Sequence, residues 1–217
     1  MRLTSLLTEY SDKVFGNALR RSALRPARAL NTPVCFIEML LLVEDKRFFS
    51  HAGVDPLAII RAAIFNLNGS VLQGASTIVQ QLYRIRTGRQ GHWDRSLRMK
   101  VYQAVWALLQ SLSKSKTALL REYLDGVYWG RSLRGLDQAA RIYFNVSRAE
   151  LSPAQSFFLA ERIATPNRFR ANRLRALLDR HAIQEAFHRY KITRDEIVNL
   201  YRQCDGLGDD VWQLLAK

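Results

Sequence analysis

The sequence predicts a mainly α fold, and three observations support that prediction. Apolar residues between Val101 and Leu112 recur at the three- and four-residue offsets that form one stripe along a helix. No segment alternates apolar and polar residues for long enough to indicate a strand. The chain has 217 residues, of which 48% are hydrophobic and 24% charged, so it can bury the core of a globular helical domain.

Other helices follow from the same apolar periodicity and from local start and stop signals. Residues 88–94 are polar and contain glycine, and helical periodicity resumes after them, so we expect an exposed loop there. Arginine becomes frequent beyond Pro166, and Thr193 and Glu196 match a capping box that would open a late helix at Asp195. The other expected helices cover residues 34–49, 56–67, 76–86, 116–123, 136–144 and 152–164.

The charge of the chain indicates an anionic partner. Lys and Arg outnumber Asp and Glu by 33 to 19, which gives a formal net charge of +14. Nucleic acid, an acidic membrane surface and a phosphorylated substrate all fit this charge, and composition alone does not choose among them. Cys35 and Cys204 lack the spacing of a metal knuckle or a redox pair, so we expect free thiols.

No targeting or spanning segment is expected from the sequence. Residues 1–30 carry scattered arginines and no central apolar block followed by a cleavage site, so they do not resemble a signal peptide. The most apolar stretch, residues 33–43, contains Glu38 and is shorter than the roughly 20 residues that a spanning helix needs.

The first stretch that suggests chemistry begins with two adjacent acids, Glu44 and Asp45, at the end of an apolar segment. If the helix continues, Glu44, Phe48 and His51 lie on one face, at offsets of four and seven residues. A carboxylate beside aromatic side chains is partly desolvated and is suited to act as a general base. Two solvated acids at a helix end would explain the same pattern.

The second stretch is a glycine turn at Gly74 followed by Ser76 and Thr77 at a predicted helix start. A helix start offers free backbone N–H groups and a positive dipole end to an anion. Gln81 and Arg84 follow Thr77 at offsets of four and seven, so the three side chains could line one groove. A capped helix with a polar outer face explains these residues equally well.

A basic segment comes next, opposed within its span only by Asp94. One guanidinium group can bind two oxygens of a phosphate at once, so this segment would bind a pyrophosphate well. Tyr83 and Trp93 interleave with the cations, which leaves a nucleic-acid interface open, as does a simple solvated face. The cations of the segment are Arg84, Arg86, Arg89, Arg95, Arg98 and Lys100.

The order and spacing of these stretches resemble the family 51 peptidoglycan glycosyltransferases, which include monofunctional transglycosylases and the glycosyltransferase domain of class A penicillin-binding proteins. Residues 44–53 resemble the first family signature, Glu-Asp-x-x-Phe-x-x-His-x-Gly, and residues 74–84 resemble the second, Gly-x-Ser-Thr-Ile-x-Gln-Gln-x-x-Lys. Further similarity runs through residues 115–130 and 134–144, and several ordered motifs are more specific than any one of them.

The resemblance implies a lysozyme-like helical domain with a substrate cleft, over residues 33–170. Residues 1–32 would be a helical segment on an anionic membrane surface, and residues 171–217 a helical appendage. The family polymerises lipid II onto a lipid-linked glycan chain at the extracytoplasmic face of the bacterial cytoplasmic membrane, for cell-wall biogenesis and cell shape. The acceptor 4-hydroxyl attacks the donor's anomeric carbon with inversion, and undecaprenyl pyrophosphate departs.

By position, Glu44 matches the family's catalytic base, and Gln103 stands where the family has a second glutamate. Glutamine keeps the shape of glutamate without its charge, so it would hold Mg²⁺ or Mn²⁺, the only cofactors the family suggests, less well. Arg84 replaces the lysine of the second signature. The resemblance places these residues at the substrate: Asp45, Phe48, His51, Ser76, Thr77, Gln80, Gln81, Arg84, Arg95, Arg98 and Lys100.

Three hypotheses of function follow. The first is an active lipid II polymerase. The second is a catalytically weakened or inactive relative that binds lipid-linked glycan or a partner protein, for which Gln103 is the main argument. The third is a basic helical nucleic-acid-binding protein, which explains the charge but not the ordered motifs, so no nucleic acid is expected as a partner. The membrane contact would come from the first helix, with Arg20, Arg21, Arg25 and Arg28.

Overall fold

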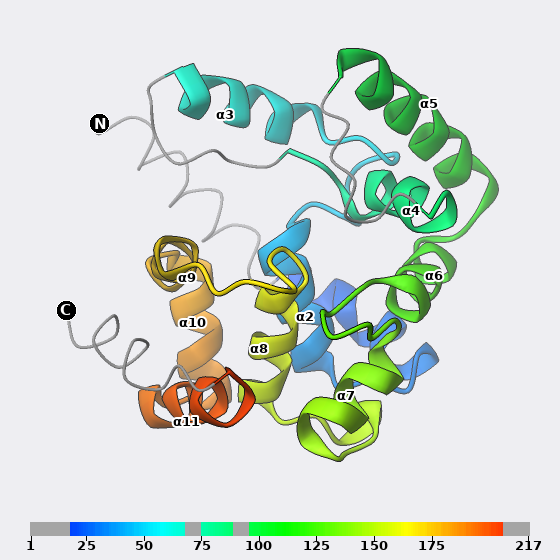
Figure 1. The fold of residues 1–217 in the computed structure, drawn as a ribbon. Helices are drawn as coiled ribbons and strands as arrows, with labels where there is room; N and C mark the ends of the chain where they lie inside the picture. Colours follow the sequence, from blue (N-terminus) through cyan, green and yellow to red (C-terminus); the bar gives the residue numbers. More distant parts are fainter. Residues whose placement is uncertain (1–17, 68–74, 89–95, 206–217) are drawn as a thin grey trace. The chain divides into compact units, whose positions relative to one another are not determined.

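A computed structural model describes residues 18–67, 75–88 and 96–205 of the chain, and these residues are mostly helical (Figure 1). Within these ranges the β pairing consists of an isolated bridge between Tyr128 and Arg134. The mainly α fold predicted from the sequence is therefore confirmed. The chain divides into two compact units, and each is described by itself: unit 1 comprises Met1–Lys46 and Tyr128–Lys217, and unit 2 comprises Arg47–Val127.

A helix lies in each of the ranges expected from the sequence, and further helices follow residue 170. Unit 2 contains α3 (Pro56–Leu67), α4 (Ile78–Arg86), α5 (Leu97–Ser113) and α6 (Lys116–Gly126). Unit 1 contains a helix over residues 18–29, α2 (Val34–Glu44), α7 (Leu136–Phe144), the short 3₁₀ helix η1 (Arg148–Glu150), α8 (Pro153–Arg162), α9 (Ala171–Leu178), α10 (His181–Tyr190) and α11 (Arg194–Asp205).

The core of unit 1 surrounds α2, whose residues from Cys35 to Val43 are all buried. An α-helix that is apolar on every side has to be enclosed by other elements. Helix α8 lies against α2, and α10 and α11 pack beside this pair (Figure 1). The one acid inside α2, Glu38, accepts hydrogen bonds from Arg189 and from the hydroxyl of Tyr190, both on α10. The buried charge is thus compensated, as burial requires.

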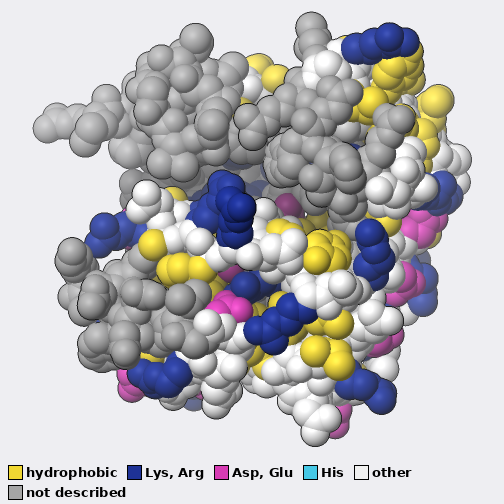
Figure 2. Space-filling model, viewed as in Figure 1, with side chains coloured by type: hydrophobic (Ala, Val, Ile, Leu, Met, Phe, Trp, Pro, Cys, Tyr) yellow, Lys and Arg dark blue, Asp and Glu magenta, His cyan; other side chains and the backbone are white. Residues whose placement is uncertain are grey.

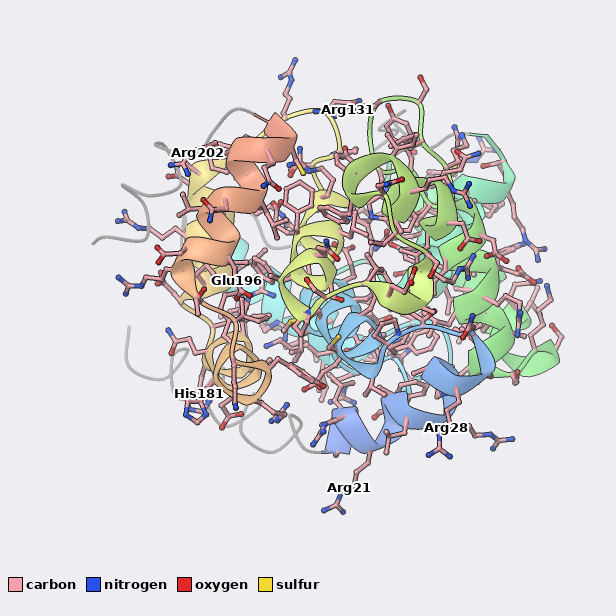
Figure 3. All side chains as sticks on the ribbon, turned by 90° about the horizontal axis from the view of Figure 1, so that it is seen from below. Arg21, Arg28, Arg131, His181, Glu196 and Arg202 are labelled. Carbon is pink, nitrogen blue, oxygen red and sulfur yellow. The ribbon has the colours of Figure 1, made fainter. Side chains whose placement is uncertain are left out.

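The helix over residues 18–29 packs its apolar face into unit 1. Leu19, Ala23 and Ala27 are buried on one side, whereas the arginines at 20, 21, 25 and 28 are exposed. Figure 3 shows Arg21 and Arg28 pointing away from the ribbon. The apolar face of this helix therefore packs against the rest of the protein and not against a bilayer. The exposed face carries the arginines.

The segment that follows residue 170 is built into the same unit. Leu174 and Leu177 of α9, Ile183 of α10 and Tyr201 of α11 are all at most 1% exposed. Thr193 and Glu196 form the expected capping box, since the Glu196 carboxylate accepts from the Thr193 N–H at 2.8 Å. The late helix begins at Arg194, one residue earlier than expected.

The end of α2 corrects one expectation. The helix stops at Glu44 and does not run to residue 49, because Asp45 is extended, with φ −159° and ψ 75°. Residues 46–50 form turns, with a hydrogen bond from the Ser50 N–H to the Arg47 carbonyl. Two adjacent acids at the negative end of a helix dipole disfavour its continuation. The prediction that Glu44, Phe48 and His51 share one helical face is therefore wrong.

Unit 2 is organised around Gly53. This glycine has φ +92°, and a Cβ built there would lie 2.3 Å from the Ala107 carbonyl oxygen of α5. The Thr77 hydroxyl at the start of α4 donates to the Gly53 carbonyl at 2.6 Å. Only glycine satisfies both the left-handed backbone and this close approach. The glycine of the first sequence stretch thus fixes α4 and α5 in place.

Helix α5 buries few of its side chains and exposes an apolar stripe. Gln103 and Ala107 are buried at 8% and 0% exposure. The stripe that predicted the helix is exposed, with Leu109 at 58% and Leu112 at 81%, and Figure 2 shows hydrophobic side chains over α5. Among the described residues no helix combines the length and the apolar character needed to cross a membrane. The other exposed large apolar side chains described in α5 and α3 are Val101, Tyr102, Val105, Leu108, Leu57, Ile59, Ile60 and Ile64.

Candidate functional site

Glu44 is the last residue of α2, and its side chain is 9% exposed. A carboxylate at the C-terminal end of a helix faces the negative end of the dipole, so its position opposes the preference of an isolated helix. The last turn of α2 contains no basic residue. Instead, Arg173 of α9 brings a guanidinium nitrogen to 3.5 Å from Glu44 Oε1, and Arg180 donates to the Leu42 carbonyl at 3.4 Å. Cations from far along the chain therefore compensate this helix end.

Arg173 is shared between two carboxylates. Its Nε lies 4.0 Å from Oε1 of Glu161, whose side chain is 3% exposed. Glu161 accepts hydrogen bonds from Tyr201 at 2.9 Å and Thr165 at 3.4 Å. Burial raises the pKa of the Glu161 carboxyl, although the Tyr201 hydrogen bond and the nearby arginines act in the opposite direction. Burial and the Glu161 charge together raise the pKa of Tyr201 well above its ordinary value.

This arrangement of Glu44, Arg173, Glu161 and Tyr201 was missed in the sequence. The four residues come from α2, α9, α8 and α11, and no spacing pattern links them. The sequence offered only a weak signal, since Glu44 and Glu161 are acids within largely apolar segments. Asp45, which follows Glu44, is 6% exposed, and its backbone N–H donates to the Leu41 carbonyl at 2.9 Å to close α2.

Phe48 and His51 of the first stretch help to build unit 2. Phe48 is fully buried, and its ring meets the His51 ring edge to face at 6.4 Å between centroids. His51 Nδ1 accepts from the Gly53 N–H at 3.1 Å, which fixes the imidazole. Lys116 lies 4.7 Å from the centre of the Phe48 ring and donates to the His51 carbonyl at 2.6 Å. These contacts tie the first stretch to the start of α6.

Some residues of the second stretch cap α4 and are buried, and others are partly exposed to solvent. Thr77 and Gln80 form a complete capping box at the start of α4 and are 2% and 9% exposed. The sequence left open whether these residues cap a helix or bind a ligand, and the structure shows the cap. Ser76, Gln81 and Arg84 remain half-buried, and the Tyr123 hydroxyl donates to Gln81 Oε1 at 2.9 Å.

The basic segment has two kinds of cation. Arg86, in the last turn of α4, pairs with Glu122 and lies 5.4 Å from the centre of the Trp106 ring. Arg98 and Lys100 are exposed at the start of α5, whose first turn contains no acid. Cations at the positive end of a helix dipole are unfavourable by about 0.3–1 kcal/mol each, which an anion bound there would relieve. Arg89 and Arg95 lie outside the described residues.

Gln103 lies on the inner side of α5 and is 8% exposed. Its amide offers a neutral oxygen, a weaker ligand for a divalent cation than a carboxylate. Within the described ranges no three side chains of His, Cys, Asp or Glu gather as a metal site would need. Binding of Mg²⁺ or Mn²⁺ stays a prediction.

The sequence-predicted site residues fall into both units. Glu44 and Asp45 belong to unit 1, whereas Phe48, Thr77, Arg98 and the other described candidates belong to unit 2. Within unit 2, hydrogen bonds through Gly53 join the first stretch to the second. The gathering of all of these side chains in one cleft stays a prediction.

The chain is similar to a known protein family and to proteins of several bacteria. The family model described as Transglycosylase matches residues 12–203. Penicillin-binding protein 1A of Rickettsia typhi is 33% identical over 175 residues, which is 76% of this chain and 22% of that protein. Penicillin-binding protein 1B of Haemophilus influenzae is 30% identical over 193 residues, or 86% of this chain and 23% of that protein. The chain thus spans somewhat more than a fifth of the length of these relatives.

Proposed function

Because the chain belongs to the transglycosylase family, with a family match over residues 12–203, we propose that it is a peptidoglycan glycosyltransferase that polymerises lipid II. The family match and the names of the relatives support the enzyme class that the sequence motifs predicted. They give no support to a nucleic-acid-binding protein. The substrates in this proposal are lipid II and a lipid-linked glycan chain, and the products are a longer glycan and undecaprenyl pyrophosphate.

The observation that carries the proposal is the position of Glu44. This carboxylate is nearly buried, stands at the helix end that disfavours it, and lies beside the guanidinium of Arg173. Such a group is suited to accept a proton in a water-poor environment. Glu44 takes the proton of the acceptor's 4-hydroxyl while that oxygen forms a bond to the donor's anomeric carbon. The bond from that carbon to the pyrophosphate oxygen breaks with its electron pair, and the configuration inverts.

The start of α5 is proposed to receive the departing pyrophosphate. Arg98 and Lys100 are exposed there, at the positive end of the helix dipole. Positive groups fixed in advance stabilise the negative charge that develops on a leaving group. Arg95, which the resemblance also assigns to phosphate binding, immediately precedes Ser96, the N-cap residue of α5. The dipole of α5 opposes both cations, although Arg98 also lies 5.6 Å from the centre of the Tyr102 ring on the same helix.

Association with a membrane surface is part of the proposal, because lipid II is a membrane lipid. The exposed apolar faces of α3 and α5, including Ile60 and Leu109, offer contacts to lipid chains. The exposed arginines of the helix over residues 18–29 offer electrostatic contacts to anionic headgroups. By family resemblance, this surface is the extracytoplasmic face of the bacterial cytoplasmic membrane.

A weakened or inactive relative is the second candidate function, and Gln103 is the observation that favours it. Its amide is buried where the resembling enzymes carry a glutamate, so a charge that could hold a neighbouring cation is missing. On this account, lipid II still binds while chemistry is slow. Gln103→Glu should then raise the polymerisation rate, or its response to added Mg²⁺ or Mn²⁺, with little change in lipid II affinity. Unchanged rates in the variant would remove the argument from Gln103.

The test is incubation of the purified protein with labelled lipid II in detergent, with glycan products resolved by length. Polymer from the wild type, and its loss in Glu44→Gln, supports the first candidate. Binding of lipid II without polymer supports the second. Salt-dependent binding of DNA with no binding of lipid II would overturn both.

A further inference from the structure

Glu161 is a buried acid that the proposed reaction does not use. It lies near the end of α8, with its side chain 3% exposed, and burial raises the pKa of its carboxyl. Burying a carboxylate is costly unless its oxygens are satisfied. Here Oε2 accepts from the Tyr201 hydroxyl at 2.9 Å, and Oε1 accepts from Thr165 at 3.4 Å and faces Nε of Arg173 at 4.0 Å. Two helices and a loop thus converge on this acid.

Arg173 connects this acid to Glu44. The guanidinium presents its NH2 group to Glu44 at 3.5 Å and its Nε to Glu161 at 4.0 Å. The Nε atom is buried and has no hydrogen-bond partner, although the geometry of a guanidinium allows one at each nitrogen. Both distances are longer than a full hydrogen bond, so the guanidinium lies between the two carboxylates and can tighten onto either. Its backbone is held because Leu174 and Leu177 anchor α9 in the core.

We propose, on the basis of the function proposed above, that Arg173 and Glu161 are positioning residues for Glu44. Arg173 holds the Glu44 carboxylate in one orientation towards the acceptor hydroxyl. Glu161, fixed by Tyr201, holds the guanidinium and provides a second anion for it. When Glu44 takes up the acceptor proton and becomes neutral, the Arg173 charge remains compensated by Glu161.

The first arm of the test is kinetic and uses lipid II as substrate. Arg173→Met should lower kcat about ten- to a hundredfold with a smaller change in KM, because displacement of a catalytic group by about 1 Å costs up to that much. Arg173→Lys should recover part of the loss. Glu161→Gln should lower kcat less than Arg173→Met does. The double variant Arg173→Met with Glu161→Gln should have the same kcat as Arg173→Met alone. The matched control is Arg175→Met, which removes an exposed cation from the same helix and should retain wild-type kcat.

The second arm measures thermal unfolding and does not depend on activity. In the double-mutant cycle of Glu44→Gln and Arg173→Met, a direct interaction should appear as a non-additive Tm change of about 2–4 °C. Tyr201→Phe, which removes one hydroxyl from Glu161, should lower kcat in the same direction as Glu161→Gln. Circular dichroism verifies that each variant is folded before it is assayed.

Two results would overturn this inference. One is wild-type kcat in folded Arg173→Met, and the other is additive Tm changes for Glu44→Gln and Arg173→Met. If the fold-losses in kcat of Arg173→Met and Glu161→Gln multiply in the double variant, Glu161 acts independently of Arg173 and is removed from the inference. If the wild type makes no glycan while the Tm cycle shows coupling, the proposed function fails and the pairing of Arg173 with Glu44 stands.

Discussion

Glu44 and Thr77 are both polar residues of the sequence motifs and both stand at a helix end, but they differ in how they relate to that end. Thr77 is the N-cap of α4, where a hydroxyl is preferred, and its oxygen accepts from the Gln80 N–H at 3.2 Å. Glu44 stands at the C-terminal end of α2, where a negative charge is disfavoured. Folding alone explains Thr77 and does not explain Glu44.

The same contrast separates two cations of the basic segment. Arg86 lies in the last turn of α4, where the dipole favours it, and pairs with Glu122. Arg98 lies in the first turn of α5, where the dipole opposes it, and is exposed. Positions at which a residue violates a local folding preference are expected to be functional. By this criterion we expect Glu44 and Arg98 to serve the reaction, and Thr77 and Arg86 to stabilise the fold.

The largest expected effect is that of Glu44→Gln on turnover. Removal of a general base costs about 10²–10⁴-fold in rate, so kcat on lipid II should fall by that factor. The free energy of unfolding should change by about 1 kcal/mol or less, because loss of the Arg173 ion pair is offset by relief at the helix end. Chain-length analysis of labelled glycan and urea unfolding measure the two quantities. Wild-type turnover in this variant would place Glu44 with the architectural residues.

The next effect concerns the cations at the start of α5. Arg98→Gln with Lys100→Gln should raise the KM for lipid II about tenfold, as expected for the loss of roughly 1.4 kcal/mol of phosphate binding. The same variant should be more stable by about 0.3–1 kcal/mol per charge removed, because the cations oppose the dipole. Arg86→Gln is the comparison, and it should lower stability through loss of the Glu122 pair. A less stable double variant would contradict the assignment of Arg98 and Lys100 to binding.

Local features of the fold were predictable from the sequence, and features that depend on tertiary context were not. Apolar periodicity predicted most of the helices, although not α9 and α10 individually, and the capping box at Thr193 marked the start of α11 within one residue. The end of α2 was predicted too late because apolar periodicity does not register the conformation of Asp45. The stripe on α5 predicted a helix correctly, but Leu112 is 81% exposed, and periodicity cannot tell a core-facing stripe from an outward one.

For the candidate site, the motifs named individual residues but not their partners. The roles of Thr77 and Gln80 in a helix cap could be predicted from the sequence, because a capping box joins residues only three positions apart. The contacts of Glu44 with Arg173 and of Arg173 with Glu161 join residues 129 and 12 positions apart, and no local pattern encodes them. Gly53 is an intermediate case, since the motif included it but its positive φ and the approach of Ala107 explain why it must be glycine.

A moderate effect is expected for Thr77→Ala. Loss of an N-cap hydroxyl costs about 1 kcal/mol, and the buried Gly53 carbonyl also loses its donor, so the free energy of unfolding should fall by about 1–2 kcal/mol. Thr77→Ser keeps the hydroxyl and should retain most of the stability. Turnover of the folded fraction at low temperature should stay near that of the wild type. A large loss of kcat with an unchanged free energy of unfolding would show that Thr77 takes part in the reaction.

The smallest effect is expected for Glu122→Gln. It tests, through the pH dependence of the free energy of unfolding, whether the pairing of Glu122 with Arg86 stabilises the fold. Glu122 is 31% exposed and pairs with both Arg86 and Lys114. Burial acts to raise the pKa of its carboxyl, but the hydrogen bonds and charges of Lys114 and Arg86 outweigh burial, and the pKa lies below its ordinary value of 4.5. A lowered pKa in the folded state stabilises the fold above the unfolded pKa, and the contribution is lost as pH falls through the folded pKa.

The free energy of unfolding of Glu122→Gln should therefore lie below that of the wild type by up to about 1 kcal/mol at pH 7, the usual limit for a partly exposed pair. The difference should shrink as pH falls below 4.5 and should also shrink in 1 M salt, which screens exposed charges. Urea unfolding at pH 7 and pH 3, at low and high salt, measures all of these differences. A difference that grew on acidification would show that Glu122 is favoured in its protonated form, and the pairing with Arg86 would not be what stabilises the end of α4.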